Sequence, residues 1–231
     1  MLTEFNLLWN NIMSNQAPGL NAYEISLFLT QAQEVVVNNI CESFEQSEAM
    51  ISYLSPLVRQ ETLDMVPCSS EYEIPFNKRM HIVPHSKLFK LPDDLILRTH
   101  ETLHVIDECG HVRKYDVVPV TQDAFDRTMS DPFKCPNNRR ALRLAFDYNV
   151  EESGSCYSGR YSEIICLDNN PDNDCKYTVR YIAKPQPIVL VTLDDNHAID
   201  GVKEVTPCRL NENIQRRIIA KAVEIAKSVW S

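Results

Sequence analysis

The chain has 231 residues, of which 44% are hydrophobic, so it is long enough to bury the core of one or two domains. Its 32 acidic and 23 basic side chains give a formal net charge of −9, which disfavours a surface that binds the phosphates of nucleic acid. The sequence contains no apolar run of the roughly 20 residues that a membrane-spanning helix needs, so we predict no membrane partner.

The first quarter of the chain has the spacing of amphipathic helices. Thr3 is positioned to cap the first helix, whose apolar face comprises Phe5, Leu8, Trp9 and Ile12. The second helix opens at the capping-box pair Asn21 and Glu24, and Leu20 and Ile25 occupy the positions of a hydrophobic staple.

The second helix and the segment after it predict buried stripes. The stripe of the second helix comprises Phe28, Ala32, Val35, Val36 and Ile40, whereas Gln31, Gln33, Glu34 and Asn38 are expected largely on other faces. A third helix, capped by Ser47, is predicted to bury Ile51, Leu54, Leu57 and Val58.

From about Glu71 the pattern changes to short runs rich in Val, Ile, Tyr and Phe, which predicts strands. We expect two hairpins, one pairing 95–106 with 112–118 and the other pairing 161–167 with 176–183. A further strand is predicted from the alternating residues Leu142, Leu144, Phe146 and Tyr148. A short helix is expected near 121–129, and the whole sheet is predicted to be antiparallel.

The last helix has a continuous apolar stripe, which should pack against the first helices. The stripe comprises Leu210, Ile214, Ile218, Ala222, Ile225 and Val229, widened by Ile219, Val223 and Trp230. The predicted fold is therefore α+β. Residues 1–62 and 208–231 form a discontinuous helical bundle, from which a β-rich domain of residues 63–207 extends.

Two groups of residues resemble metal sites, and we weigh each against a structural interpretation. Asp168, Asn170, Asp172 and Asp174 alternate as calcium ligands do, but Asn173 stands where such a loop needs glycine and Val179 where it needs glutamate. A solvated hairpin tip is the favoured interpretation. His100, His104, Cys109 and His111 are zinc-capable types, yet histidines scattered on a strand are common and no metal is predicted.

The eight cysteines do not form a motif for a disulfide framework, a zinc site or a nucleophile. They lie at Cys41, Cys68, Cys109, Cys135, Cys156, Cys166, Cys175 and Cys208 without CxxC pairs, and we interpret them as free thiols of a cytoplasmic protein. The sequence also lacks a phosphate-binding glycine loop and a serine elbow, so neither catalytic residues nor cofactors are predicted.

Several stretches resemble virion proteins of crAss-like bacteriophages. The N-terminal ones are Asn10–Leu20, Glu24 and 28–34. Further ones are Leu91–Leu95, Val118–Thr121 with Asp123, Asp131–Lys134, Tyr181–Pro185 and Cys208–Leu210, so the similarity runs over nearly the whole chain.

This resemblance implies a subunit of the connector, an adaptor ring that joins the portal to the tail and is similar to tail-tube and adaptor proteins of short-tailed phages. It implies a homo-oligomer of twelve subunits, with the portal protein and adjacent tail or ring proteins as partners. Viral DNA would pass through the channel without specific binding. The implied location is the portal vertex of the virion, after assembly in the host cytoplasm.

We expect the interfaces to involve exposed loops. The candidate residues are Asp131, Pro132, Phe133, Asn137 and Asn138 in one loop, and Asp168, Asp172 and Asp174 at the predicted hairpin tip. Three alternatives to the connector remain. They are another virion component, such as a lower tail ring, a tail-tube segment or an ejected cargo protein; a metal- or thiol-dependent enzyme; and a module that binds a host protein.

Overall fold

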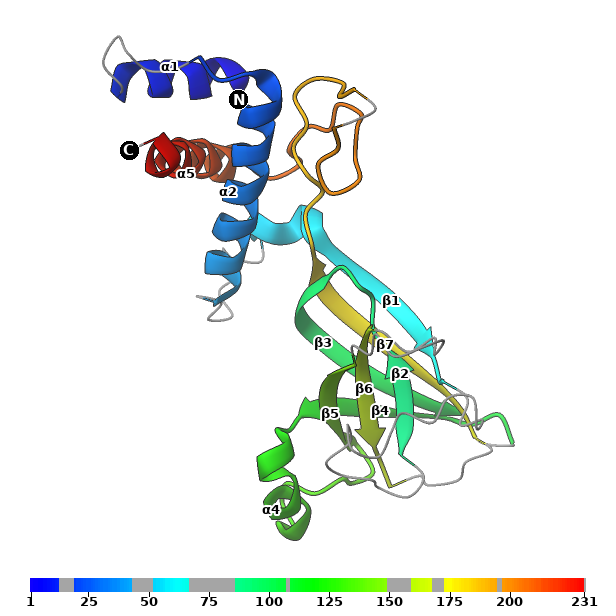
Figure 1. The fold of residues 1–231 in the computed structure, drawn as a ribbon. Helices are drawn as coiled ribbons and strands as arrows, with labels where there is room; N and C mark the ends of the chain where they lie inside the picture. Colours follow the sequence, from blue (N-terminus) through cyan, green and yellow to red (C-terminus); the bar gives the residue numbers. More distant parts are fainter. Residues whose placement is uncertain are drawn as a thin grey trace. The chain divides into compact units, whose positions relative to one another are not determined.

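The computed structural model describes residues 1–12, 19–42, 52–66, 86–106, 109–148, 159–167, 173–194 and 197–230 (Figure 1). These residues belong to two compact units, and the fold is mixed α+β. The first unit comprises Met1–Val58 and Ala183–Ser231 and contains the long helices; the second comprises Arg59–Ile182 and contains the sheet. The segment 184–206 thus belongs with the helices. The predicted division into a helical domain and a β-rich domain, with boundaries at residues 62 and 208, stays a prediction.

The first unit is built from three helices, α1 (Leu2–Ile12), α2 (Ala22–Glu42) and α5 (Glu212–Trp230). α5 packs against both α1 and α2 (Figure 1). The predicted capping box is confirmed, because the Asn21 N–H donates to Glu24 Oε2 and the Glu24 N–H donates to Asn21 Oδ1, both at 2.8 Å. Both other helices therefore pack against α5. That the three helices form a closed bundle stays a prediction.

Most of the predicted apolar stripes are buried. The rings of Phe5 and Trp9 stack with centroids 6.4 Å apart, and both side chains are buried. Three positions differ from the prediction: Val35 and Val229 are exposed, whereas Gln33 is buried. A stripe on a helix is wide, and which of its edges is covered depends on the neighbouring segments rather than on the helix itself.

The predicted third helix is wrong in its second half. Residues 52–54 are helical, a single 3-10 turn η1 (Ser55–Leu57) follows, and Val58 already begins a strand. Pro56 has no N–H to donate to a carbonyl in the preceding turn, which favours the end of the helix here. Leu54 and Leu57 are nevertheless buried. Ser47 and Ile51 lie outside the described residues.

The second unit contains a curled sheet of seven described strands (Figure 1). The strands are β1 (Val58–Asp64), β2 (Lys87–Lys90), β3 (Leu95–Ile106), β4 (Val112–Pro119), β5 (Arg140–Tyr148), β6 (Gly159–Ile165) and β7 (Asp174–Ala183). Their order in the sheet is β1-β7-β3-β4-β5-β6-β2. The β-rich region therefore begins at Val58, earlier than the sequence pattern indicates.

The hairpin of β3 and β4 is confirmed, with Ile106 opposite Val112 next to the turn. The prediction of a wholly antiparallel sheet is wrong, because β4 and β5 run parallel with Asp116 opposite Arg140. Parallel neighbours need a crossover that returns the chain to the starting end. The crossover here contains the 3-10 turn η4 (Gln122–Ala124), helix α4 (Phe125–Ser130) and the loop after it.

The second predicted hairpin is also wrong. β6 and β7 form close to the predicted positions, but β6 lies between β5 and β2, and β7 lies between β1 and β3. Alternation of apolar residues predicts that a segment is a strand, but it does not specify the partner strand. Both edges of β6 are occupied by other strands, so β7 pairs elsewhere.

The crossover packs against one face of the sheet. Phe125 of α4 forms a buried apolar cluster with Leu144 of β5 and Ile165 of β6, and Val120 lies against them. The short helix predicted near 121–129 is thereby confirmed as η4 and α4. This packing fixes the position from which the following loop, 131–139, leaves α4 and leads into β5.

A polar cluster lies in the core of the second unit. Arg143 Nε of β5 is 2.8 Å from Glu101 Oε2 of β3, and both side chains are 8% exposed. The Tyr177 hydroxyl of β7 donates to the same carboxylate at 2.6 Å. Burial, reinforced by the charge of Glu101, raises the pKa of Tyr177, while burial and the nearby Arg143 lower the pKa of Arg98. Glu101 is therefore the central acceptor of this cluster.

Candidate interaction surfaces

The loop that follows α4 is held by its own hydrogen bonds. Asp131 Oδ1 accepts the Phe133 N–H at 2.9 Å, and the Asp131 carbonyl accepts the N–H groups of Lys134 and Cys135. At the other end, Asn137 Oδ1 accepts the N–H groups of Arg139 and Arg140, each at 2.9 Å. Asx turns of this kind fix a loop without burying it.

One more contact ties the two ends of this loop together. The Arg140 guanidinium donates from Nη1 to the Phe133 carbonyl at 2.6 Å, and Arg140 itself begins β5. The Phe133 backbone is thus anchored to the sheet while its side chain is 87% exposed. Among the described residues, no large hydrophobic side chain is more exposed. An exposed aromatic ring on an anchored backbone is the type of side chain that anchors protein interfaces.

The predicted interface residues differ in what surrounds them. Pro132, Phe133, Asn137 and Asn138 are exposed, and Asp131 is partly exposed and lies 3.6 Å from Lys134 Nζ in an ion pair. Asp174 is exposed at the start of β7. Asp168 and Asp172 lie outside the described residues. The exposure of the 131–138 loop agrees with a surface role, and its role as an interface stays a prediction.

The metal-capable residues are spread over the surface of the second unit. His100, Cys109 and His111 are exposed and His104 is partly exposed. Among the described residues, no group of three or more His, Cys, Asp or Glu side chains lies close enough to hold a metal ion. Asn170 and Pro171 of the calcium-like run lie outside the described part of the chain.

The described cysteines divide into buried and accessible ones. Cys166 and Cys175 are buried, Cys109 is exposed, and the rest are intermediate. Burial raises the pKa of the Cys41 and Cys208 thiols, which makes both poorer nucleophiles at neutral pH. Cys68 and Cys156 lie outside the described residues.

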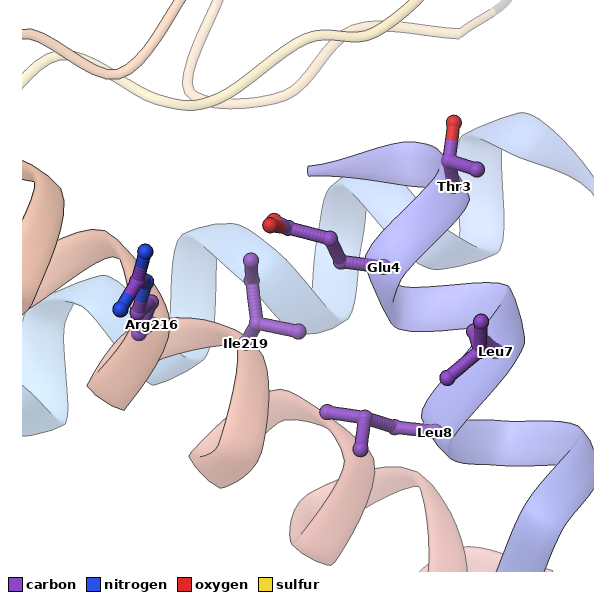
Figure 2. A pocket seen from close by; sticks show the side chains of 6 residues that line it. All are labelled: Thr3, Glu4, Leu7, Leu8, Arg216 and Ile219. Carbon is purple, nitrogen blue, oxygen red and sulfur yellow. The ribbon is translucent and has the colours of Figure 1, made fainter.

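A groove lies between α1 and α5 in the first unit (Figure 2). It has a volume of about 410 Å³ and is lined by Thr3, Glu4, Leu7, Leu8, Arg216 and Ile219. Figure 2 shows Leu8 of α1 and Ile219 of α5 pointing into the space between the helices, with Glu4 above them. Leu7 is 59% exposed on the rim. Sequence patterns missed this groove because its walls come from opposite ends of the chain.

A second feature that sequence reasoning missed is a polar stripe on α2. Ser26 Oγ accepts the Leu190 N–H at 3.1 Å, and Thr30 Oγ1 accepts the Ile188 N–H at 3.0 Å. Gln33 Nε2 donates to the Gln186 carbonyl at 2.7 Å. The spacing of Ser26, Thr30 and Gln33 within an apolar face was the available signal.

These side chains attach the segment 186–190 to the helix and satisfy backbone groups that a loop would otherwise expose. The same segment continues into a small irregular hairpin, in which Val189 pairs with Thr206 and Ile199 with Val202. Asp200 and Gly201 form its turn with positive φ angles of 48° and 78°. The first unit therefore consists of helices with a docked, loop-rich arm.

Comparison with known proteins identifies the class of protein to which these surfaces belong. The model of the family described as phage tail ring protein 3/4 matches residues 1–230. The chain belongs to this family. The resemblance to virion proteins of crAss-like bacteriophages is thereby confirmed, and this phage tail ring family member is a structural virion component.

Two relatives from one phage are similar to this ring-family protein over almost their full length. "Ring protein 4/5" of Bacteroides phage crAss001 is 34% identical, with 98% of this chain and 90% of the relative covered. "Ring protein 3" of the same phage is 31% identical, with 96% of this chain and 91% of the relative covered. Among the described helices of the ring-family protein, none is long and apolar enough to span a membrane.

Proposed function

We propose that this protein is a structural, non-enzymatic subunit of a closed homo-oligomeric ring at the head-to-tail junction of a crAss-like phage. The ring joins the portal to the tail and forms part of the channel through which DNA passes. The observation that carries this proposal is the family match over residues 1–230, together with two relatives that are named as ring proteins.

The two surfaces described above fit a ring subunit. A cyclic ring needs heterologous contacts, in which one surface of each subunit meets a different surface of its neighbour. The exposed loop 131–138 is one such surface and the groove between α1 and α5 is another. The net charge of −9 supports passage of DNA without adhesion, because phosphates are repelled on average.

Cryo-electron microscopy of purified phage particles tests this proposal. We expect density for this chain in a closed ring at the portal vertex, with twelve copies as the predicted number. Density in which this chain touches the portal protein on one side and a tail protein on the other would support the connector role. Absence of the chain from the portal vertex and from every ring of the tail would contradict a ring subunit.

A lower ring of the tail is the second candidate, and one observation favours it. The two relatives come from one phage and bear different ring numbers, 3 and 4/5, which is consistent with several related rings stacked along a tail. The same particle map separates the two positions, because a lower ring contacts ring proteins on both sides and does not touch the portal.

A further inference from the structure

We propose that neighbouring copies of this chain bind one another by inserting Phe133 of one copy into the groove between α1 and α5 of the next. This inference rests on the proposed function, because it names the contact that would build the ring. Loop 131–138, which carries Phe133, is called the knob below, and the groove keeps the six lining residues given above.

The knob is preorganised for binding. Phe133 is 87% exposed, yet its N–H is held by Asp131 and its carbonyl by Arg140, so its backbone does not have to be ordered when a partner arrives. An aromatic ring left in water represents a large apolar area that association would bury.

The groove has the size and lining for one aromatic side chain with its neighbours. Its volume of about 410 Å³ lies within the range of sites that receive compact ligands. Leu7 and Leu8 of α1 and Ile219 of α5 provide the apolar surface. Leu7 is 59% exposed, so the groove, like the knob, leaves apolar area in water in the isolated chain.

Charges beside the two surfaces are complementary. Lys134 follows Phe133 directly and its side chain is 71% exposed, while Glu4 lies in the groove and its side chain is 60% exposed. Arg216 lies in the groove as well, opposite in charge to Asp131 of the knob. Within one chain Lys134 pairs with Asp131, Glu4 with the N-terminal amine and Arg216 with Glu212, but these ion pairs are weak enough to be exchanged for contacts with a neighbour. A chain with a net charge of −9 repels its own copies overall, so local pairs of opposite charge favour this docking over others.

A second copy is the occupant that the family membership supports. The knob and the groove are different surfaces of one chain, so their union is heterologous and continues from copy to copy, and it forms a ring when the rotation between copies closes. An isologous contact between two grooves would stop at a dimer. The knob of a neighbouring copy therefore accounts for both exposed apolar features at once.

Self-association of the purified full chain tests the contact by sedimentation velocity over a wide concentration range. Phe133→Ala removes the aromatic ring of the knob, and Leu7→Arg places a charge at the exposed rim of the groove. Each variant alone should associate about 30-fold or more weakly, as expected for an interface hot spot. Val112→Ala and Asn6→Arg are the matched controls, because both positions are exposed and lie outside the knob and the groove.

Mixing the two defective variants gives the decisive readout. Phe133→Ala retains a groove and Leu7→Arg retains a knob, so an equimolar mixture should form a heterodimer that neither variant forms alone. No heterodimer, or unchanged association of either single variant, would overturn the inference.

The outcomes for the contact and for the ring are separable. A wild-type chain that stays monomeric throughout the concentration range would overturn the proposed self-contact. If the particle map nevertheless shows this chain in a ring, the ring function stands and only this contact is wrong. If Phe133 instead lies against a different virion protein in that map, the self-contact is overturned and the loop remains an interface.

Discussion

Removal of the Glu101 carboxylate should destabilise the sheet strongly, because two cationic side chains depend on it. Arg143 Nε lies 2.8 Å from Glu101 Oε2, and both side chains are 8% exposed. The negative charge of Glu101 also acts on the guanidinium of Arg98. At that distance the attraction is about 6 kcal/mol for an effective dielectric constant of about 20. Desolvation of both ions offsets much of it, so the measurable quantity is the cost of leaving Arg143 buried without its partner.

We expect Glu101→Ala to lower the free energy of unfolding by about 3 to 5 kcal/mol, the usual range for a broken buried pair. Among the described residues, the Arg143 Nε–H has no hydrogen-bond partner, so the pair is mainly electrostatic and the lower end applies. Glu101→Gln should cost about 1 kcal/mol less, because the amide oxygen still accepts from Tyr177. Adding Arg143→Met to Glu101→Gln should recover part of the loss, since the unpaired cation is removed.

The assay has to report on the sheet by itself. Both tryptophans, Trp9 and Trp230, lie in helices of the first unit, so their fluorescence is unsuitable here. Hydrogen–deuterium exchange of peptides from β3, β5 and β7 in increasing urea measures the local free energy of opening. Asp64→Ala is the control, because its ion pair with Lys176 of β7 lies in the same sheet but is exposed, and it should contribute at most about 0.5 kcal/mol. A loss below about 1 kcal/mol for Glu101→Ala would refute the reasoning.

The remaining predictions concern pH, the docked arm and the interface loop. Burial raises the folded-state pKa of Tyr177 above its ordinary value near 10, so the unfolded chain loses this proton first and the stability of the sheet should fall above about pH 10. In urea titrations at several pH values, Tyr177→Phe should reduce this slope, and the remainder should come largely from Tyr181, whose pKa is also raised by burial. Thr30→Val leaves the buried Ile188 N–H without its acceptor and should cost the helical unit about 1 to 3 kcal/mol, measured by Trp9 fluorescence in urea; a cost below about 0.5 kcal/mol would contradict this. Asn137→Ala should raise amide exchange in peptides covering 131–140 by about 10-fold, whereas Asn138→Ala at the exposed neighbouring position should not, and equal rates in the two variants would show that the side chain does not hold the loop.

Local chemistry was sufficient to predict the start of α2, the short crossover helix and one hairpin, whereas Thr3, the predicted cap of the first helix, lies inside α1. The capping box at Asn21 and Glu24 involves atoms within one turn, and the hairpin of β3 and β4 joins segments that are adjacent in sequence. The loop 131–138 was predictable as an exposed segment because aspartate, asparagine and proline favour turns. The 87% exposure of Phe133 was not predictable, since an aromatic residue in a loop is as easily folded inward.

Long-range pairing decided the rest. The parallel contact of β4 and β5 and the separation of β6 from β7 depend on which edges other strands have already occupied, and no residue in those strands encodes this alone. The groove and the docked segment 186–190 likewise join parts of the chain that are far apart in sequence. The sequence by itself determined where most helices and strands form, because periodicity and capping act over a few residues. Only the tertiary structure decided their partners and the exposed surfaces, because burial is a property of distant segments brought together.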